Sequence, residues 1–178
     1  MTASKRWTTR PEGANWGDFG PDDQLGTLNF LQAEQRLHAA SEIRVGLSFS
    51  LSLPLNVPRA PVLNPRRKGP VIRAAEKNGV PVYRYPLAND VPGATDVISD
   101  DSVTLSPQYS TQWDALGHVG SLFDPHGNGQ PVPTGYNGFA VSEPNASDFQ
   151  GTAALSIAPM ATHGIQGRGV MVDLRAHF

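Results

Sequence analysis

Nine residues in the middle of the chain combine the side-chain types that acid–base chemistry requires. They read S-T-Q-W-D-A-L-G-H, Ser110–His118, and they place Asp114 and His118 four residues apart, next to Trp113. A carboxylate can hold a divalent cation, and a neutral imidazole can accept and release a proton near neutral pH. An indole beside them can form the wall of a pocket for a planar substrate, although tryptophans are more often simply packed. The segment therefore predicts a candidate catalytic site.

The same nine residues also have a purely structural interpretation. Aspartate is a good N-cap, so Asp114 could begin a helix and His118 could be a buried histidine inside it. A second histidine, His126, follows after a short interval in the tight loop Asp124–Gly129. For His126 we favour a hydrogen-bonding position in that loop over a place in the site.

The composition predicts one loop-rich domain. A chain of 178 residues has the size of a single domain, and we expect one domain over residues 1–178. At this size, folding can bury about 70% of the surface that the unfolded chain exposes, so a core is possible. Its 18 glycines and 16 prolines together exceed the average share of about 12%, which indicates many turns and long loops.

Charge and cysteine content argue against several classes of protein. The net charge of −2 gives no electrostatic reason to expect nucleic acid or an anionic membrane as a partner. The chain has no cysteine, which excludes disulfides, thiolate metal ligands and a cysteine nucleophile. The first ten residues carry basic side chains with no apolar run behind them, so we expect no signal peptide, no membrane span and a cytoplasmic protein, with a cell-surface location left open.

One helix and one strand are the clearest predicted elements. Gln32–Arg44 is rich in good helix formers and lacks internal glycine and proline, so it predicts a helix. Ala33, Leu37 and Ala40 share one face of that helix, which we expect to pack on a sheet. Leu47–Leu55 alternates leucine or phenylalanine with serine or proline, a pattern that predicts a strand with its apolar side chains on one face.

Weaker patterns predict the remaining elements. Val80–Leu87 and Ser102–Leu105 can each form a short strand, and Gly151–Ala158 a short helix or strand. Gly167–Leu174 is typical of a buried strand that ends in an aspartate. Residues 56–79 form a basic, proline-containing loop that could cover a site, contact another subunit or simply be solvated.

The N-terminal residues predict an irregular segment that lies over a core. Trp7, Trp16 and Phe19 are spread among glycine, proline and aspartate between residues 1 and 26, and we expect these aromatic side chains to anchor the segment. The run D-D-Q-L-G, Asp22–Gly26, could be a metal-binding loop, but we favour a turn that leads into a helix.

Four segments together resemble the cyclase family of metal-dependent hydrolases, in a longer branch with a Q-W-D variant of the site motif. The family includes enzymes of the bacterial kynurenine formamidase and isatin hydrolase kind. The segments are Trp16–Asn29 (W-G-D-F-G-P-D-D-Q-L-G-T-L-N), Ser110–Val119 (S-T-Q-W-D-A-L-G-H-V), Tyr136–Gly138 (Y-N-G) and His163–Leu174 (H-G-I-Q-G-R-G-V-M-V-D-L). The resemblance implies an α/β fold with a swivelling β/β/α-type mixed sheet, few helices and long loops.

The resemblance also implies roles for individual residues. The formamidase branch has the motif H-x-G-T-H-x-D-x-P-x-H, whose first two histidines and aspartate bind metal and whose last histidine donates and accepts protons. Laid on this sequence, the motif puts Gln108 and Gln112 at the two metal-binding histidines. It puts Asp114 at the metal-binding aspartate and His118 at the catalytic histidine. Amide oxygens in place of imidazoles favour manganese or magnesium over zinc, or abolish binding, so the implied cofactor is one of these divalent ions.

Members of this branch are considerably longer than this chain, and their remaining metal ligands, a histidine and a glutamate, lie in the C-terminal part. We therefore expect either the N-terminal part of a longer family fold or a natural short form. An unfinished sheet leaves a strand edge exposed, which favours a homo-oligomer or a complementing chain.

Three functions are consistent with these residues. The first is a metal-dependent hydrolase of a small amide or cyclic amide, such as an aryl formamide of tryptophan catabolism, with Asp114 on the metal and His118 as general acid and base. The second is a non-catalytic binding or assembly module that keeps the cyclase scaffold. The third is a metal-free enzyme that uses the two side chains for dehydration or ring closure. A serine nucleophile is disfavoured because the chain lacks G-x-S-x-G.

Overall fold

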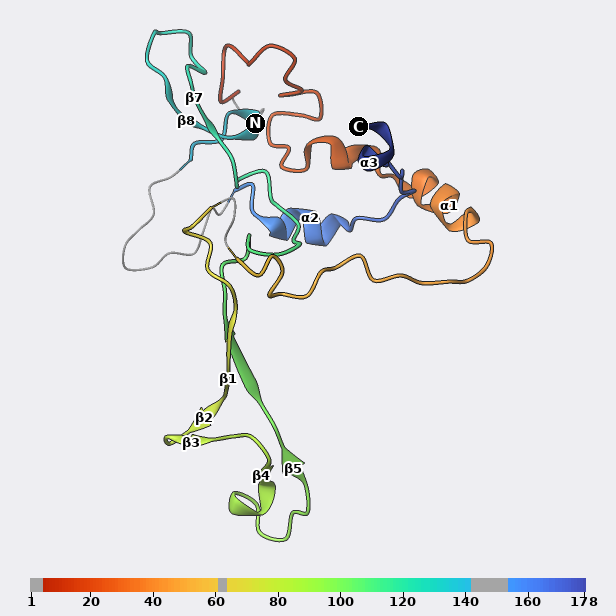
Figure 1. Ribbon diagram of the computed structural model, residues 1–178. Coiled ribbons are helices and arrows are strands. Elements are labelled where there is room, and N and C mark those ends of the chain that lie inside the picture. Colours follow the sequence, from red (N-terminus) through yellow and green to blue (C-terminus); the bar gives the residue numbers. More distant parts are fainter. Residues whose placement is uncertain (1–4, 61–63, 142–153) are drawn as a thin grey trace. The chain divides into compact units, whose positions relative to one another are not determined.

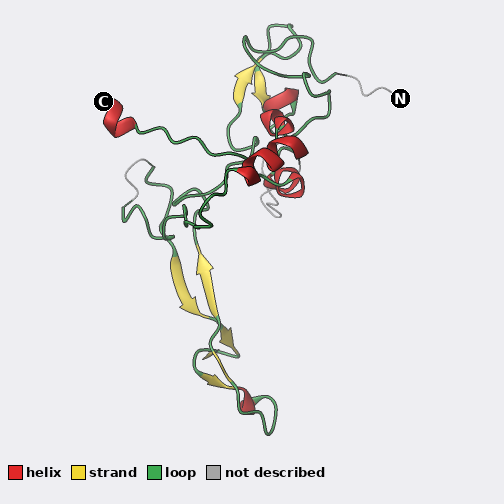
Figure 2. Cartoon of the chain, turned by 90° about the vertical axis from the view of Figure 1, so that its right-hand side faces the viewer, coloured by secondary structure: helices red, strands yellow, loops and turns green. Residues whose placement is uncertain are grey.

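The computed structural model describes residues 5–60, 64–141 and 154–178. The chain forms two compact units, which we call unit 1 (Met1–Ser48 and Trp113–Phe178) and unit 2 (Phe49–Gln112). Short helices and two-stranded antiparallel sheets are joined by long loops in both (Figure 2). This architecture confirms a mixed α/β chain with few helices and much loop. The single domain over residues 1–178 stays a prediction.

Within the part that the structure describes, unit 1 holds the α-helices and one β-hairpin (Figure 1). The helical segments are η1 (Gly26–Phe30), α1 (Ala33–Ser41), η3 (Tyr136–Gly138), α2 (Ile157–His163) and α3 (Leu174–His177). The hairpin pairs β7 (Ser121–Phe123) with β8 (Val132–Thr134). The predicted tight loop Asp124–Gly129 follows β7, and the Asp124 carboxylate accepts hydrogen bonds there from the backbone N–H groups of His126 and Gly129.

In its described residues, unit 2 has three two-stranded antiparallel sheets and one 3₁₀ turn (Figure 1). The pairs are β1 (Val71–Ala74) with β6 (Asp101–Thr104), β2 (Glu76–Lys77) with β3 (Val80–Pro81), and β4 (Tyr85–Pro86) with β5 (Val97–Ile98); the turn is η2 (Leu87–Asn89). Strands were predicted around β3, β4 and β6. The prediction that residues 56–79 are entirely loop was wrong at β1 and β2, because these strands find partners farther along the chain.

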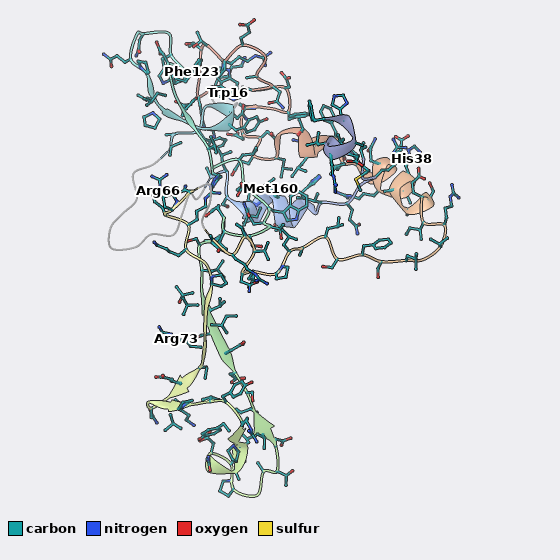
Figure 3. All side chains as sticks on the ribbon, in the orientation of Figure 1. Trp16, His38, Arg66, Arg73, Phe123 and Met160 are labelled. Atoms are coloured by element: carbon teal, nitrogen blue, oxygen red, sulfur yellow. The ribbon has the colours of Figure 1, made fainter. Side chains whose placement is uncertain are left out.

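Aromatic side chains form the core of unit 1. Trp7 and Trp16 are only 6% and 7% exposed, and their rings meet edge to face with centroids 5.8 Å apart. Trp16 makes a second such contact, at 5.6 Å, with Phe123 of β7, and the two side chains lie close together in Figure 3. These contacts confirm that the N-terminal segment is anchored by its tryptophans.

Helix α1 is present within the predicted range, but its apolar face does not pack on a sheet. None of its residues is buried, and Leu37 is 72% exposed. Polar contacts hold it instead: Gln32 and Gln35 form a capping box, and Arg36 binds His163 at the end of α2. Alanines at two of the three face positions offer little apolar area, which explains why the face is left in solvent.

The prediction of a strand at Leu47–Leu55 was wrong. The segment is extended without strand pairing, and Phe49 and Leu51 are 78% and 89% exposed. A strand needs the backbone of a partner, yet the Leu53 N–H donates at 2.9 Å to the side chain of Thr111. The alternating pattern therefore shows only that this segment could pair as a strand. Among the described residues it has no partner strand.

The prediction of a buried strand at Gly167–Leu174 was also wrong. Val170 and Met171 are 82% and 91% exposed and belong to no strand. Asp173 instead caps a helical turn, because its carboxylate accepts a hydrogen bond at 3.0 Å from the Ala176 N–H at the start of α3. In the described part of the chain, no helix has the length and apolar character of a membrane span.

Candidate functional site

Asp114 and His118 lie on one tight turn in unit 1. The His118 N–H donates to the Ala115 carbonyl at 2.9 Å, which closes the turn over Ala115–His118. Asp114 Oδ1 lies 4.0 Å from His118 Nδ1, and the two side chains are 46% and 28% exposed. No helix begins at Asp114, so the interpretation of this residue as an N-cap was wrong. The turn presents a carboxylate and an imidazole to solvent, side by side.

Two hydrogen bonds of the Leu155 backbone connect this turn to the N-terminal segment. The Gly117 N–H donates to the Leu155 carbonyl at 2.9 Å, and the Leu155 N–H donates to Gln24 Oε1, also at 2.9 Å. Leu155 is only 3% exposed, so both bonds are protected from water. Leu116, on the same turn, lies beside Gly26, where an added Cβ would be 3.5 Å from its Cδ1. His118 is thus positioned by the chain around Gln24 and Gly26.

The buried side chain of Asn137 holds the N-terminal segment in shape. Its Oδ1 accepts from the Gly17 N–H at 2.9 Å, and its Nδ2 lies 3.0–3.1 Å from the carbonyls of Gly20, Pro21 and Asp23. Asn137 is fully buried and has a φ of 56°, a left-handed conformation that asparagine tolerates better than most residues. One carboxamide therefore fixes the loop that carries Asp23 and Gln24.

Asp23 and Tyr136 form a second link between the same segments. Asp23 Oδ2 accepts from the Tyr136 hydroxyl at 2.8 Å and from the Gly26 N–H at 2.8 Å. Burial of Asp23 disfavours its charged form, but the hydrogen bonds from Asn29, Gly26, Tyr136 and Leu25 outweigh it and lower the pKa of Asp23. Burial, followed by the hydrogen bond to Asp23, raises the pKa of Tyr136, so the phenol remains a donor. The predicted turn at Asp22–Gly26 is confirmed, and it leads into η1.

Sequence reasoning named these segments but did not identify the residues that join them. Trp16–Asn29 and Tyr136–Gly138 were singled out only for their resemblance to a family. The available signal was the Asn-Gly pair at Asn137, because asparagine before glycine often marks left-handed backbone. No sequence pattern shows that such a residue is fully buried or which segment it binds.

The other candidate residues fall on either side of the boundary between the units. Gln108 and Gln112 belong to unit 2, whereas Trp113 belongs to unit 1 with Asp114 and His118. The Gln108 carbonyl accepts a hydrogen bond at 3.3 Å from the Arg67 guanidinium. The Trp113 side chain is 69% exposed. The grouping of Gln108 and Gln112 with Asp114 and His118 in one site stays a prediction.

The implied metal site is not completed by the residues described. Within residues 5–60, 64–141 and 154–178, no three histidine, cysteine, aspartate or glutamate side chains lie where they could share an ion. Asp114 and His118 supply two groups of these types. A stable site for a divalent ion requires more ligands than this pair.

Comparison with known proteins relates this chain to a solved structure. No family model and no curated protein matches the sequence. A solved structure described as the crystal structure of a novel cyclase is similar to this chain, with 28% sequence identity and a TM-score of 0.61. The match covers 84% of this chain and 45% of that one, so the chain spans less than half of the solved cyclase. The resemblance to the cyclase family is thereby confirmed.

Proposed function

We propose that this chain carries the acid–base part of a cyclase-type hydrolase that cleaves a small amide or cyclic amide, such as an aryl formamide. One observation carries the proposal: Asp114 and His118 lie 4.0 Å apart on one partly exposed turn, in a chain similar to a solved cyclase. A carboxylate and an imidazole in this arrangement can move protons during attack of water on a carbonyl carbon.

The proton steps follow from the geometry of the pair. His118 Nδ1 faces Asp114, so Nε2 is the nitrogen available to take a proton from water. The resulting hydroxide adds to the amide carbonyl, and the C–N bond breaks as the imidazolium returns the proton to the leaving nitrogen. The products are a carboxylic acid and an amine, and His118 is regenerated in its neutral form.

Asp114 and His118 are expected to contribute unequally to the rate of hydrolysis. At 4.0 Å the pair is too long for a hydrogen bond, so Asp114 acts on the imidazolium through charge alone. Both groups reach water, where such an attraction is worth about 1 kcal/mol, or roughly fivefold in rate. A positioned general base contributes about 10²- to 10⁴-fold. His118 is therefore expected to dominate, with Asp114 as its orienting partner.

Metal dependence belongs to this proposal as an expectation from the family. In such a site Asp114, Gln112 and Gln108 are the side chains that we expect near a manganese, zinc or magnesium ion, which would polarise the carbonyl. The described residues do not complete a ligand set, so no step above is assigned to an ion. The swivelling β/β/α arrangement, and a second copy or complementing chain that completes it, are likewise proposed.

A non-catalytic binding or assembly module is the second candidate. The observation that favours it is that each unit has apolar side chains in solvent: Phe49 and Leu51 in unit 2 are 78% and 89% exposed, and Leu122 in unit 1 is 76% exposed. Exposed apolar side chains in such number are typical of surfaces that bind other polypeptides. In a module of this kind the cyclase-like fold would serve assembly, and Asp114 and His118 would take no part in catalysis.

Two measurements separate these functions. The first is the metal content of the purified wild-type protein and of the Asp114→Ala variant. If the chain is a metal-dependent hydrolase, the variant should contain much less metal than the wild type. The second is the turnover of an N-formyl aromatic amine, with and without a chelator. Turnover that persists without metal supports the metal-free acid–base enzyme. Negligible metal in both proteins together with no turnover would leave the binding module as the remaining function.

A further inference from the structure

A groove in unit 1 lies beside the chain that positions His118. It has a volume of about 620 Å³, a size that suits a small organic molecule. Its apolar lining comes from Leu25, Ala158 and Pro159, and its polar lining includes Ser156, Thr162 and His163. Ser156 directly follows Leu155, whose carbonyl accepts the hydrogen bond from Gly117 on the catalytic turn.

Helix α2 forms one side of this groove. Ser156 is its N-cap residue and His163 its last residue, and Ala158, Pro159 and Thr162 lie between them. Met160, which is labelled on this helix in Figure 3, is only 7% exposed. Helix α2 therefore buries one of its apolar side chains within unit 1.

A positive charge lies at the His163 end of the groove. The Arg36 guanidinium donates to the His163 carbonyl at 3.1 Å and lies 3.4 Å from His163 Nε2. A guanidinium only donates hydrogen bonds, so a hydrogen bond between these two groups requires Nε2 as the acceptor. Among the described residues, no carboxylate forms an ion pair with Arg36, whereas nearby Glu42 pairs with Arg168 at 3.7 Å.

We propose that this groove binds small organic acids that carry an apolar body. The carboxylate lies at the Arg36–His163 end, where the Arg36 guanidinium is the kind of donor that such an anion prefers. The apolar body lies over Leu25, Ala158 and Pro159. A role of this groove in catalysis rests on the proposed function. In that case the substrates would be amides that bear a carboxylate.

Binding of phenylacetate to the purified protein tests the proposal, with neutral phenylacetamide as the matched ligand. Calorimetry should show saturable binding of phenylacetate at least tenfold tighter than that of phenylacetamide, and weaker binding as salt is added. Arg36→Gln should weaken phenylacetate binding at least tenfold. Arg36→Lys, which keeps the charge, should weaken it less, and Arg44→Gln should leave it within twofold. Circular dichroism checks that each variant is folded.

Three results would overturn the groove as an acid-binding site. They are no saturable binding of phenylacetate, equal binding of the acid and the amide, or wild-type binding by a folded Arg36→Gln protein. The His118→Gln variant separates this proposal from the proposed function, because it lies outside the groove and should bind phenylacetate normally. Saturable phenylacetate binding by a wild-type protein that hydrolyses no amide would support the groove and contradict the hydrolase.

Discussion

The Asp23 carboxylate accepts a hydrogen bond from the Tyr136 hydroxyl at 2.8 Å, across 113 positions of sequence. This contact and the neighbouring bonds of Asn137 join the two family-like segments Trp16–Asn29 and Tyr136–Gly138. The joined segments carry Gln24, and Gln24 holds Leu155 against the turn of His118. The segments Trp16–Asn29 and Tyr136–Gly138 thus help to position the turn that carries Asp114 and His118.

Asn137 is predicted to be a main determinant of the stability of unit 1. Asn137→Ala removes the acceptor of Gly17 and the donor to three carbonyls, all in a buried position, and should cost about 3 kcal/mol. Asn137→Gly removes the same bonds but suits the φ of 56°, so it separates the side chain from the backbone conformation. Urea unfolding should show both variants strongly destabilised; a glycine variant as stable as wild type would contradict the account.

Tyr136→Phe should reduce stability mainly at neutral pH. Burial alone would raise the pKa of Asp23. The Tyr136 hydroxyl is one of the hydrogen-bond donors that lower this pKa below the ordinary value of 3.8. A depressed carboxyl pKa stabilises the fold above that ordinary value, and the stabilisation is lost as the pH falls through the folded-state pKa, below 3.8. The variant should lose about 1–2 kcal/mol at pH 7.

The pH dependence is the diagnostic part of this prediction. The gap in unfolding free energy between wild type and Tyr136→Phe should be wide at pH 7 and narrow at a pH well below 3.8, because Asp23 becomes protonated as the pH falls. Tyr83→Phe serves as the control, because that side chain is 61% exposed and should show little difference at either pH. An equal gap at both pH values would show that the hydroxyl does not act on the charge of Asp23.

Gly17→Ala and Gly13→Ala form a matched pair that tests the tryptophan core. Both glycines have left-handed backbone, with φ of +79° and +72°. A Cβ at Gly17 would lie 2.9 Å from Cζ2 of the buried Trp7 ring, whereas a Cβ at Gly13 meets nothing within 4 Å. Gly13→Ala should cost about 1 kcal/mol of backbone strain, and Gly17→Ala about 1–3 kcal/mol more. Similar losses in chemical denaturation would mean that Trp7 is not fixed against Gly17.

Leu51→Ser tests whether the segment Leu47–Leu55 is exposed, as in the structure, or buried in a sheet. Leu51 is 89% exposed, so its truncation should change the unfolding free energy by less than about 0.5 kcal/mol. A leucine facing the core of a sheet would cost about 2–5 kcal/mol instead. A large loss of stability in the variant would restore the buried strand that the sequence predicted.

Local patterns in the sequence predicted elements that depend on near neighbours. The helix at α1, the tight loop at Asp124 and the turn at Asp23 are stabilised by side chains within a few residues, so their signals are local. The strand predictions at Leu47–Leu55 and Gly167–Leu174 failed because pairing depends on a partner elsewhere, which periodicity cannot show. The sequence spacing predicted that Asp114 and His118 lie close together, and the structure places them 4.0 Å apart. The support of this pair by Gln24, Leu155 and Asn137 was not predictable, because those contacts join segments far apart in sequence.

The rate of hydrolysis of an N-formyl aromatic amine by His118→Gln tests the central claim most directly. His38→Gln is the matched control, since His38 lies on the exposed helix α1, outside the turn (Figure 3). The account predicts that kcat/KM falls about 10²- to 10⁴-fold in His118→Gln and stays within twofold in His38→Gln. A folded His118→Gln protein that hydrolyses the amide at the wild-type rate, or a wild-type protein no faster than buffer, would contradict it.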